Sequence, residues 1–189
     1  MADQTVSEAG CGAAEPRVFI VAGEDSGDLH AANLIAEMAA VAPEVRFEGF
    51  GGPRMAQAGC QLHADILHLA TMGFSFLGNL RAFLTLVWRF HQILSRRPPD
   101  VLVLVDLPGF NFVLARLARW RGVRIVYYIC PQIWAWGPWR RRKILRLTDL
   151  LLVIFPFEES FYRSARGRVV HVGHPLADEL ERAPDRTST

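Results

Sequence analysis

Short runs rich in Val, Ile and Leu alternate with longer stretches of helical character along most of this chain. We predict strands for these runs, at residues 17–22, 45–49, 101–105, 123–128 and 150–154, and a further strand at 168–172. The runs contain few polar residues, which is typical of strands that helices cover on both faces. The pattern therefore predicts an α/β fold with a Rossmann-like, doubly wound and mostly parallel sheet.

Helical stretches fit between the expected strands. We predict helices at residues 29–42, 77–96, 112–121, 139–147 and 158–164. With 189 residues, 51% of them hydrophobic, the chain is long enough to bury one sizeable core.

The two ends of the chain have a different composition from its middle. We expect a disordered leader at residues 1–16, one Rossmann-like domain at 17–176, and a linker or disordered tail at 177–189. The leader mixes Ala and Gly with acidic residues and lacks the cationic start and apolar core of a signal peptide.

Charge and cysteine content exclude several classes of function. A formal net charge of +2 is too small to mark a nucleic-acid-binding protein. The 3 cysteines are widely spaced and form no C-x-x-C pair, so neither a disulfide framework nor a structural zinc site is indicated. We expect no metal site, because no His, Cys, Asp and Glu residues have the spacing of metal ligands.

The stretch at residues 77–94 has about the length that spans a bilayer. Arg81 and Arg89 would each cost about 2.5–3.5 kcal/mol at membrane depth, so we do not expect insertion. The stretch is more apolar than burial of one stripe requires. Either it lies on a membrane surface through residues such as Leu84 and Trp88, with Arg89 at the level of the headgroups, or a partner helix covers it.

In a parallel sheet the loops that follow the strands converge on one edge, so their residues are the candidates for function. The first such loop contains Glu24, Ser26 and Asp28 between glycines, but without the spacing of a dinucleotide fingerprint. Its carboxylates would repel a pyrophosphate, which disfavours NAD. Ser26 or Asp28 is expected to cap the following helix, whereas Glu24 is expected to orient a ligand hydroxyl.

A second polar cluster follows the apolar run at 101–105. Asp106 lies at the tip of a buried strand, where partial desolvation suits a general base. An Asp that only fixes the turn by accepting backbone N–H bonds is an equally good interpretation. Asn111 either caps the next helix or contacts a ligand.

The loop after the fourth expected strand carries Gln132, Trp134 and Trp136, and a basic run that includes Arg140 and Arg141 follows it. The indoles either plug the core or form an apolar platform for a ligand. The basic run is either a solvated helix face or a site for a phosphate or an anionic headgroup. His174, between Gly173 and Pro175, is either catalytic or a structural residue in a rigid turn.

Taken together, the loop motifs resemble those of the lipid-A-disaccharide synthase family. The series, in order, is GEDSGD, GFGGPRMAQAGC, TMG, VDLPGFN, YYICPQIWAW, PFEESFY and VGHPLAD, from about residue 17 to residue 178. The resemblance implies the N-terminal half of a GT-B glycosyltransferase that is cytoplasmic and peripheral on the inner membrane. The implied reaction joins UDP-2,3-diacylglucosamine to 2,3-diacylglucosamine 1-phosphate, giving a β-1,6-linked disaccharide and UDP. No metal or organic cofactor is implied.

The resemblance also assigns roles to residues. It places Glu24, Ser26 and Asp28 along the acceptor cleft, Asp106 and Asn111 at its floor, and one wall at residues 132–136, with Asp106 as the base for the attacking 6-hydroxyl. The family commonly has a second Asp where this chain has Gly109, which puts catalysis in doubt.

The length of the sequence leaves two interpretations of function open. By resemblance, a C-terminal domain that holds the nucleotide sugar is expected to be missing, so an enzyme would need a separately encoded C-terminal half. The alternative is a non-catalytic module that binds acylated sugars or a membrane. A different Rossmann-type enzyme, such as a nucleotide-sugar epimerase or a flavin protein, is disfavoured by the acidic first loop and the Trp-rich later one.

Overall fold

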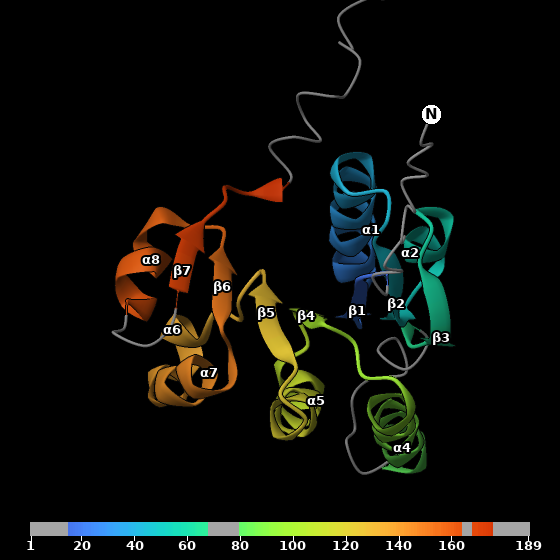
Figure 1. Cartoon of the computed structure of the whole chain (residues 1–189). Coiled ribbons are helices and arrows are strands. Elements are labelled where there is room, and N and C mark those ends of the chain that lie inside the picture. The colour runs from blue at the N-terminus through green and yellow to red at the C-terminus, as the bar shows by residue number, and fades with distance from the viewer. Residues whose placement is uncertain (1–14, 68–79, 164–167, 176–189) are drawn as a thin grey trace, which may run out of the picture.

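A single parallel sheet with helices on both faces organises the chain (Figure 1). The computed structural model describes residues 15–67, 80–163 and 168–175. Within them the strand order is β3-β2-β1-β4-β5-β6-β7, and every neighbouring pair is parallel. The strands are β1 Arg17–Ala22, β2 Arg46–Gly51, β3 Gln61–Asp65, β4 Val101–Val105, β5 Arg124–Tyr128, β6 Leu150–Val153 and β7 Arg168–His171. The predicted doubly wound α/β sheet is confirmed.

Helices connect the strands and bury both faces of the sheet. They are α1 Asp25–Val41, α2 Pro53–Gln57, α4 Leu80–Arg96, α5 Pro108–Trp120, α6 Ile133–Trp136, the 3₁₀ helix η1 Pro138–Arg140, α7 Arg141–Leu147 and α8 Pro156–Tyr162. Alternate residues of β1 face opposite sides, as the period of a strand requires. Ile20 belongs to the core cluster that includes residues of α1 and α2, whereas Phe19 belongs to the cluster that includes residues of α4, α5, α7 and α8.

Three short elements were not expected from the sequence. The strand β3 alternates in polarity and lies at the edge of the sheet, and α2 and α6 are each only about one helical turn long, so none gives a strong periodic signal. Helices α1 and α5 also begin earlier than predicted, at Asp25 and Pro108. Asp28 and Asn111 therefore lie inside these helices. The prediction that they cap them is wrong. Residues 1–14 of the predicted leader at 1–16, the TMG motif and the predicted tail at 177–189 lie outside the described residues.

The direction of winding reverses between β1 and β4. From β1 the chain proceeds outward through β2 to β3, and from β4 it proceeds the other way through β5 and β6 to β7. Because β1 and β4 are paired, with Ala22 opposite Val105, the loops after these two strands leave the sheet side by side. Ligands of open α/β sheets bind at such a switch point.

A buried ion pair holds the opposite, amino edge of the sheet. The guanidinium of Arg17 donates two hydrogen bonds of 2.7 and 2.9 Å to Oε1 of Glu48 and one of 2.8 Å to Oε2. Burial by itself raises the pKa of Glu48, but hydrogen bonds from His63 and Arg17 outweigh it and hold this pKa below its usual range. This edge is therefore built for stability, and the carboxyl edge carries the candidate site.

Candidate active site

Two carboxyl groups meet at the switch point of the sheet. Glu24 follows β1 and Asp106 follows β4. Although Glu24 is accessible to solvent, partial burial of its carboxyl raises its pKa, and the charge of Asp106 and a hydrogen bond with that side chain raise it further. The fold therefore holds the two carboxyl groups in direct contact at this edge of the sheet.

The backbone that carries Asp106 has a sparsely populated conformation. Asp106 has φ +49° and Leu107 has φ +42°, in the left-handed region that residues with a Cβ rarely adopt. The carbonyl of Asp106 accepts hydrogen bonds from the hydroxyl of Tyr127, at 2.6 Å, and from Nδ2 of Asn111, at 2.5 Å. Nδ2 of Asn111 also lies 3.2 Å from the carbonyl of Val105. Backbone strain that the surrounding groups hold in place is typical of functional sites.

Asn111 therefore positions Asp106 through the backbone. It is fully buried in the first turns of α5, and its amide donates to the turn. The structure shows no ligand-facing surface for this side chain.

The loop after β1 passes so close to Leu107 that only a glycine fits at position 23. A Cβ atom on Gly23 would lie 2.3 Å from Cδ2 of Leu107. The strained turn after β4 thus packs its buried Leu107 side chain directly on the backbone that leads to Glu24. This contact fixes the two carboxyl-bearing loops relative to each other.

Two adjacent cavities open at Asp106. One has a volume of about 90 Å³ and is lined by residues that include Ser26, Asp106, Ile129 and His174. The second, about 290 Å³, is lined by Asp106, Pro108, Ile129, Cys130, Pro131 and Gln132. The fold thus brings Ser26 of α1, Gln132 and His174 around Asp106, although these four residues are far apart in the sequence. Ile129, which both cavities share, also has a positive φ, of 57°.

Asp28 does not line either cavity and instead stabilises the fold. Its side chain is 1% exposed. The carboxylate accepts hydrogen bonds from the backbone N–H groups of Gly52, Arg54 and Met55, at 2.8, 3.0 and 3.2 Å. Asp28 therefore caps the N-terminus of α2, a helix that the sequence did not indicate.

The Trp-rich loop is fixed from α8. Nε1 of Trp134 donates to Oε1 of the fully buried Glu158 at 3.1 Å, and the ring lies edge-on to Phe157. Oε2 of Glu158 accepts the backbone N–H groups of Ile154 and Phe155. Trp134 is thus held beside the cavities without lining them. The side chain of Trp136 lies outside the described part of the structure.

Cys130 is not a nucleophile, even though it lines the larger cavity. Burial raises the pKa of its thiol to about 12, so the thiol is protonated at neutral pH. Within the described residues, no three His, Cys, Asp or Glu side chains are grouped so that they could hold a metal ion.

Helix α4 buries one apolar face and also exposes large apolar side chains among polar ones. Leu86, Phe90 and Leu94 pack into the core, whereas Leu84 and Trp88 remain 54% and 60% exposed. The side chain of Arg89 donates to the carbonyl of His63 at 3.2 Å. No helix in the described ranges is long and apolar enough to cross a bilayer. Leu84 and Trp88 therefore form an apolar stripe of α4 that the protein core does not cover.

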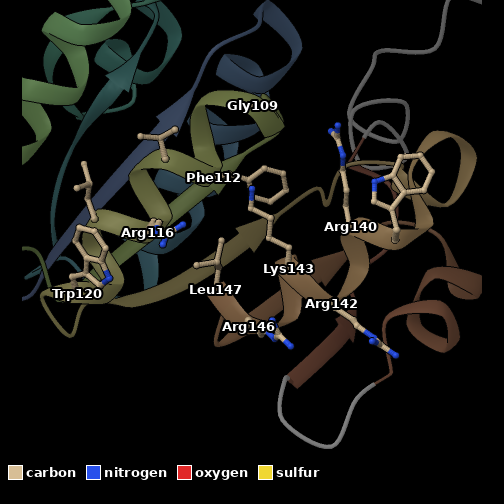
Figure 2. Close-up of a pocket in the computed structure, with 12 residues that line it drawn as sticks. Gly109, Phe112, Arg116, Trp120, Arg140, Arg142, Lys143, Arg146 and Leu147 are labelled. Atoms are coloured by element: carbon tan, nitrogen blue, oxygen red, sulfur yellow. The ribbon is translucent and has the colours of Figure 1, made fainter.

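Arg140 and Arg141 of the basic run have different surroundings. Arg141 donates hydrogen bonds to the carbonyls of Phe161 and Arg163, where α8 ends, and so ties α7 to α8. Arg140 is exposed and lines a large groove between α5 and α7 (Figure 2). Only Arg140 of this pair is placed to meet a ligand in that groove.

Sequence reasoning missed four residues that shape the site: Leu107, Tyr127, Ile129 and Glu158. Of these, only Tyr127 could have been predicted from the sequence, because the hydroxyl of a Tyr at the end of a buried strand needs a hydrogen-bond partner. The other roles depend on contacts between loops that are distant in sequence.

Comparison of the sequence with known proteins gives the family of this chain. The family model described as lipid-A-disaccharide synthetase matches residues 18–189. The chain belongs to the lipid-A-disaccharide synthetase family. Among curated relatives, the lipid-A-disaccharide synthase of Geobacter sulfurreducens is 47% identical over 169 residues, which cover 87% of this chain and 43% of the relative. That of Syntrophus aciditrophicus is 43% identical over 173 residues, covering 91% of this chain and 45% of the relative.

This member of the lipid-A-disaccharide synthetase family spans less than half the length of those curated relatives. Among solved structures it is similar to two described as UDP-N-acetylglucosamine 2-epimerase. One, from Rickettsia bellii, has a TM-score of 0.59 at 11% identity, covering 89% of this chain and 47% of that one. The other has a TM-score of 0.58 at 13% identity, covering 88% of this chain and 55% of that one. At such low identity the likeness shows the fold alone.

Proposed function

We propose that this chain carries the acceptor-binding half of a lipid-A-disaccharide synthase. The observation that carries the proposal is the Glu24 and Asp106 pair at the switch point, beside cavities lined by Ser26, Gln132 and His174. The acceptor is 2,3-diacylglucosamine 1-phosphate and the donor is UDP-2,3-diacylglucosamine. Family membership supports this choice of substrates, because the curated relatives are named lipid-A-disaccharide synthase.

In this proposal Asp106 is the general base. Its carboxylate takes the proton of the acceptor 6-hydroxyl while that oxygen forms a bond to the anomeric carbon of the donor. The bond from that carbon to the diphosphate breaks, UDP leaves with the electron pair, and the anomeric configuration inverts. Glu24 holds the base by a hydrogen bond and orients a sugar hydroxyl.

The glycine at position 109 does not leave this site without a general base. The family commonly has a carboxylate at this position, but the described lining of both cavities at Asp106 excludes Gly109. Gly109 is exposed, and a Cβ added there would meet no atom within 4 Å. We therefore assign the proton transfer to Asp106.

Turnover, in this proposal, needs more than the 189 residues of this chain. The relatives are more than twice as long as the matched segment, and we propose that their remaining part supplies the nucleotide-sugar site. We also propose that the protein works in the cytoplasm on the inner membrane, with the exposed Leu84 and Trp88 of α4 against the lipid.

Two measurements on the same preparation test the function. The first is binding of 2,3-diacylglucosamine 1-phosphate to the 189-residue chain in detergent. The second is disaccharide formation by the chain alone and by the chain mixed with the unmatched C-terminal part of the Geobacter relative. We expect binding in the first case and turnover only in the mixture. Asp106→Asn should keep acceptor binding and lower turnover by about 10²–10⁴-fold, the contribution of a general base.

Each outcome decides between the alternatives. Full turnover with Asp106→Asn would remove the assigned base. Acceptor binding without turnover in any mixture would favour the non-catalytic module. Absence of acceptor binding by a folded chain would refute the proposal as a whole.

A further inference from the structure

Helix α1 forms one wall of the smaller cavity at Asp106. Three of its residues, Ser26, Gly27 and His30, line this cavity. Ser26 and His30 are four positions apart, so they lie on the same side of the helix. His30 is only 8% exposed, so its imidazole is a buried polar group of the cavity wall. Together with Asp106 and His174, these residues give a small cavity several groups that form hydrogen bonds.

Packing within the protein does not require the glycine at position 27. Its backbone is helical, and a Cβ atom there would lie 3.7 Å from Cβ of Ala22 and from Cγ1 of Val105, at ordinary contact distance. At Gly23, by contrast, a Cβ atom would lie 2.3 Å from the side chain of Leu107. An alanine would also favour the helix more than a glycine does. The missing side chain of Gly27 therefore serves to keep the cavity open, as glycines do where a ligand approaches the backbone closely.

The size and polarity of this cavity limit what can enter it. Its volume of about 90 Å³ is room for a few water molecules, each of which occupies about 30 Å³. The adjacent cavity of about 290 Å³ shares Asp106 and Ile129 with it. A sugar ring is therefore expected in the larger cavity, and the smaller one admits a single substituent of that ring. The polar lining disfavours an acyl chain, and the carboxylate of Asp106 disfavours a phosphate, so the substituent is a hydroxyl group.

We propose that the cavity lined by Gly27 and His30 receives the 4-hydroxyl of the acceptor sugar and so selects the configuration at C4. In 2,3-diacylglucosamine 1-phosphate, only the hydroxyl groups at C4 and C6 are free. The 6-hydroxyl attacks the donor and must stay where the donor can reach it, which leaves the 4-hydroxyl for the closed cavity. The assignment rests on the proposed function, because it takes the acylated glucosamine as the ligand.

Three ligands offered to the same preparation test this assignment. They are 2,3-diacylglucosamine 1-phosphate, its 4-deoxy analogue, and its epimer at C4, 2,3-diacylgalactosamine 1-phosphate. Each is titrated into the 189-residue chain in the same detergent. We expect the first to bind at least about tenfold more tightly than either analogue, because each analogue leaves polar groups of the cavity without a hydrogen bond.

A methyl group added at position 27 should reduce this preference. Gly27→Ala places the methyl group beside Val105, which also lines the cavity, and the thermal midpoint should not fall. Binding of the acceptor should weaken by at least about fivefold, whereas that of the 4-deoxy analogue should stay within about twofold. Gly109→Ala is the matched control, because it adds a methyl group to another helical glycine with open space that lines neither cavity. Its preference should equal that of the unchanged chain.

Removal of the imidazole should have a similar effect on specificity. His30→Ala should reduce the preference for the acceptor over the 4-deoxy analogue, and His30→Gln, which keeps a donor and an acceptor, should restore part of it. Because His30 is buried, the ratio of the two affinities on one preparation is the measure that separates lost specificity from lost stability.

The outcomes separate this assignment from the proposed function. Absence of acceptor binding by the unchanged, folded chain would refute both. Equal binding of the acceptor and its 4-deoxy analogue would refute the assignment alone. So would a preference that survives in full in Gly27→Ala, or a 6-deoxy analogue whose binding becomes insensitive to that change while the 4-deoxy analogue stays sensitive, since the cavity would then receive the 6-hydroxyl.

Discussion

Glu24 and Asp106 share a hydrogen bond at the point where the winding of the sheet reverses. One side chain follows β1 and the other follows β4, and the pairing of these two strands brings them together. Partial burial of Glu24 and the nearby Asp106 raise its pKa.

The raised pKa of Glu24 makes stability depend on pH in a defined direction. Between the ordinary pKa of a Glu, about 4.3, and the raised value, the folded chain binds more protons than the unfolded chain. Stability therefore falls as the pH rises through this window, and the loss is complete above the raised pKa. Because Glu24→Gln cannot ionise, its stability relative to the unchanged chain should increase from about pH 4 to about pH 7.

Urea denaturation of both proteins at the two pH values measures this difference. Asp106→Asn serves as the control, because removing the charge of Asp106 lowers the pKa of Glu24 and should shrink the pH dependence. If the difference in the free energy of unfolding between Glu24→Gln and the unchanged chain were the same at both pH values, the raised pKa of Glu24 would be contradicted.

Removal of the Asp28 carboxylate should destabilise the fold without any direct effect on the reacting groups. Asp28→Ala leaves the N–H groups of Gly52 and Met55 buried without an acceptor and frees that of Arg54. We expect a loss of about 3 kcal/mol in the free energy of unfolding, measured in urea. Asp25→Ala, at an exposed position one turn earlier, should cost less than about 1 kcal/mol. Similar losses in the two variants would refute the capping role.

A carboxylate introduced at position 109 should stabilise the chain. Gly109 lies in the first turn of α5 and has open space around it. Replacing Gly inside a helix gains up to about 1 kcal/mol, and an acidic residue near a helix N-terminus adds about 0.3–1 kcal/mol. Gly109→Asp should therefore raise the thermal midpoint, and Gly109→Asn should raise it by less. A lower midpoint for Gly109→Asp would show that the first turn of α5 does not accept a side chain.

The exposed Leu84 and Trp88 of α4 should contribute to membrane binding. Leu84→Ser with Trp88→Ser removes two exposed apolar side chains, so stability should change by less than about 1 kcal/mol. Binding to vesicles with phosphatidylglycerol should weaken by at least about tenfold, because an inserted apolar side chain contributes about 1.5–3 kcal/mol. Val41→Ser is the control, since Val41 is 87% exposed at the end of α1, on the other face of the sheet. Unchanged binding by the α4 variant would exclude this stripe from the membrane contact.

The amino-acid sequence by itself determined the class of fold and the edge that carries the candidate site. Val101–Val105 and the similar runs before and after it are too apolar for any strand that faces water, so they specify a parallel sheet between two layers of helices. That topology in turn delivers the loops of Glu24, Asp106 and Gln132 to one edge. These features follow from local pattern, because the period and polarity of a segment decide how it is buried.

Only the tertiary structure decided which of these side chains meet. Glu24 pairs with Asp106 because β1 lies beside β4, Asp28 turns away to cap α2, and Arg141 is held by the end of α8. The left-handed turn at Asp106 likewise depends on Tyr127, which comes from the neighbouring strand β5. The sequence could not reveal these pairings, because each joins segments whose distance is set by strand order and by long-range packing, and no local period records either.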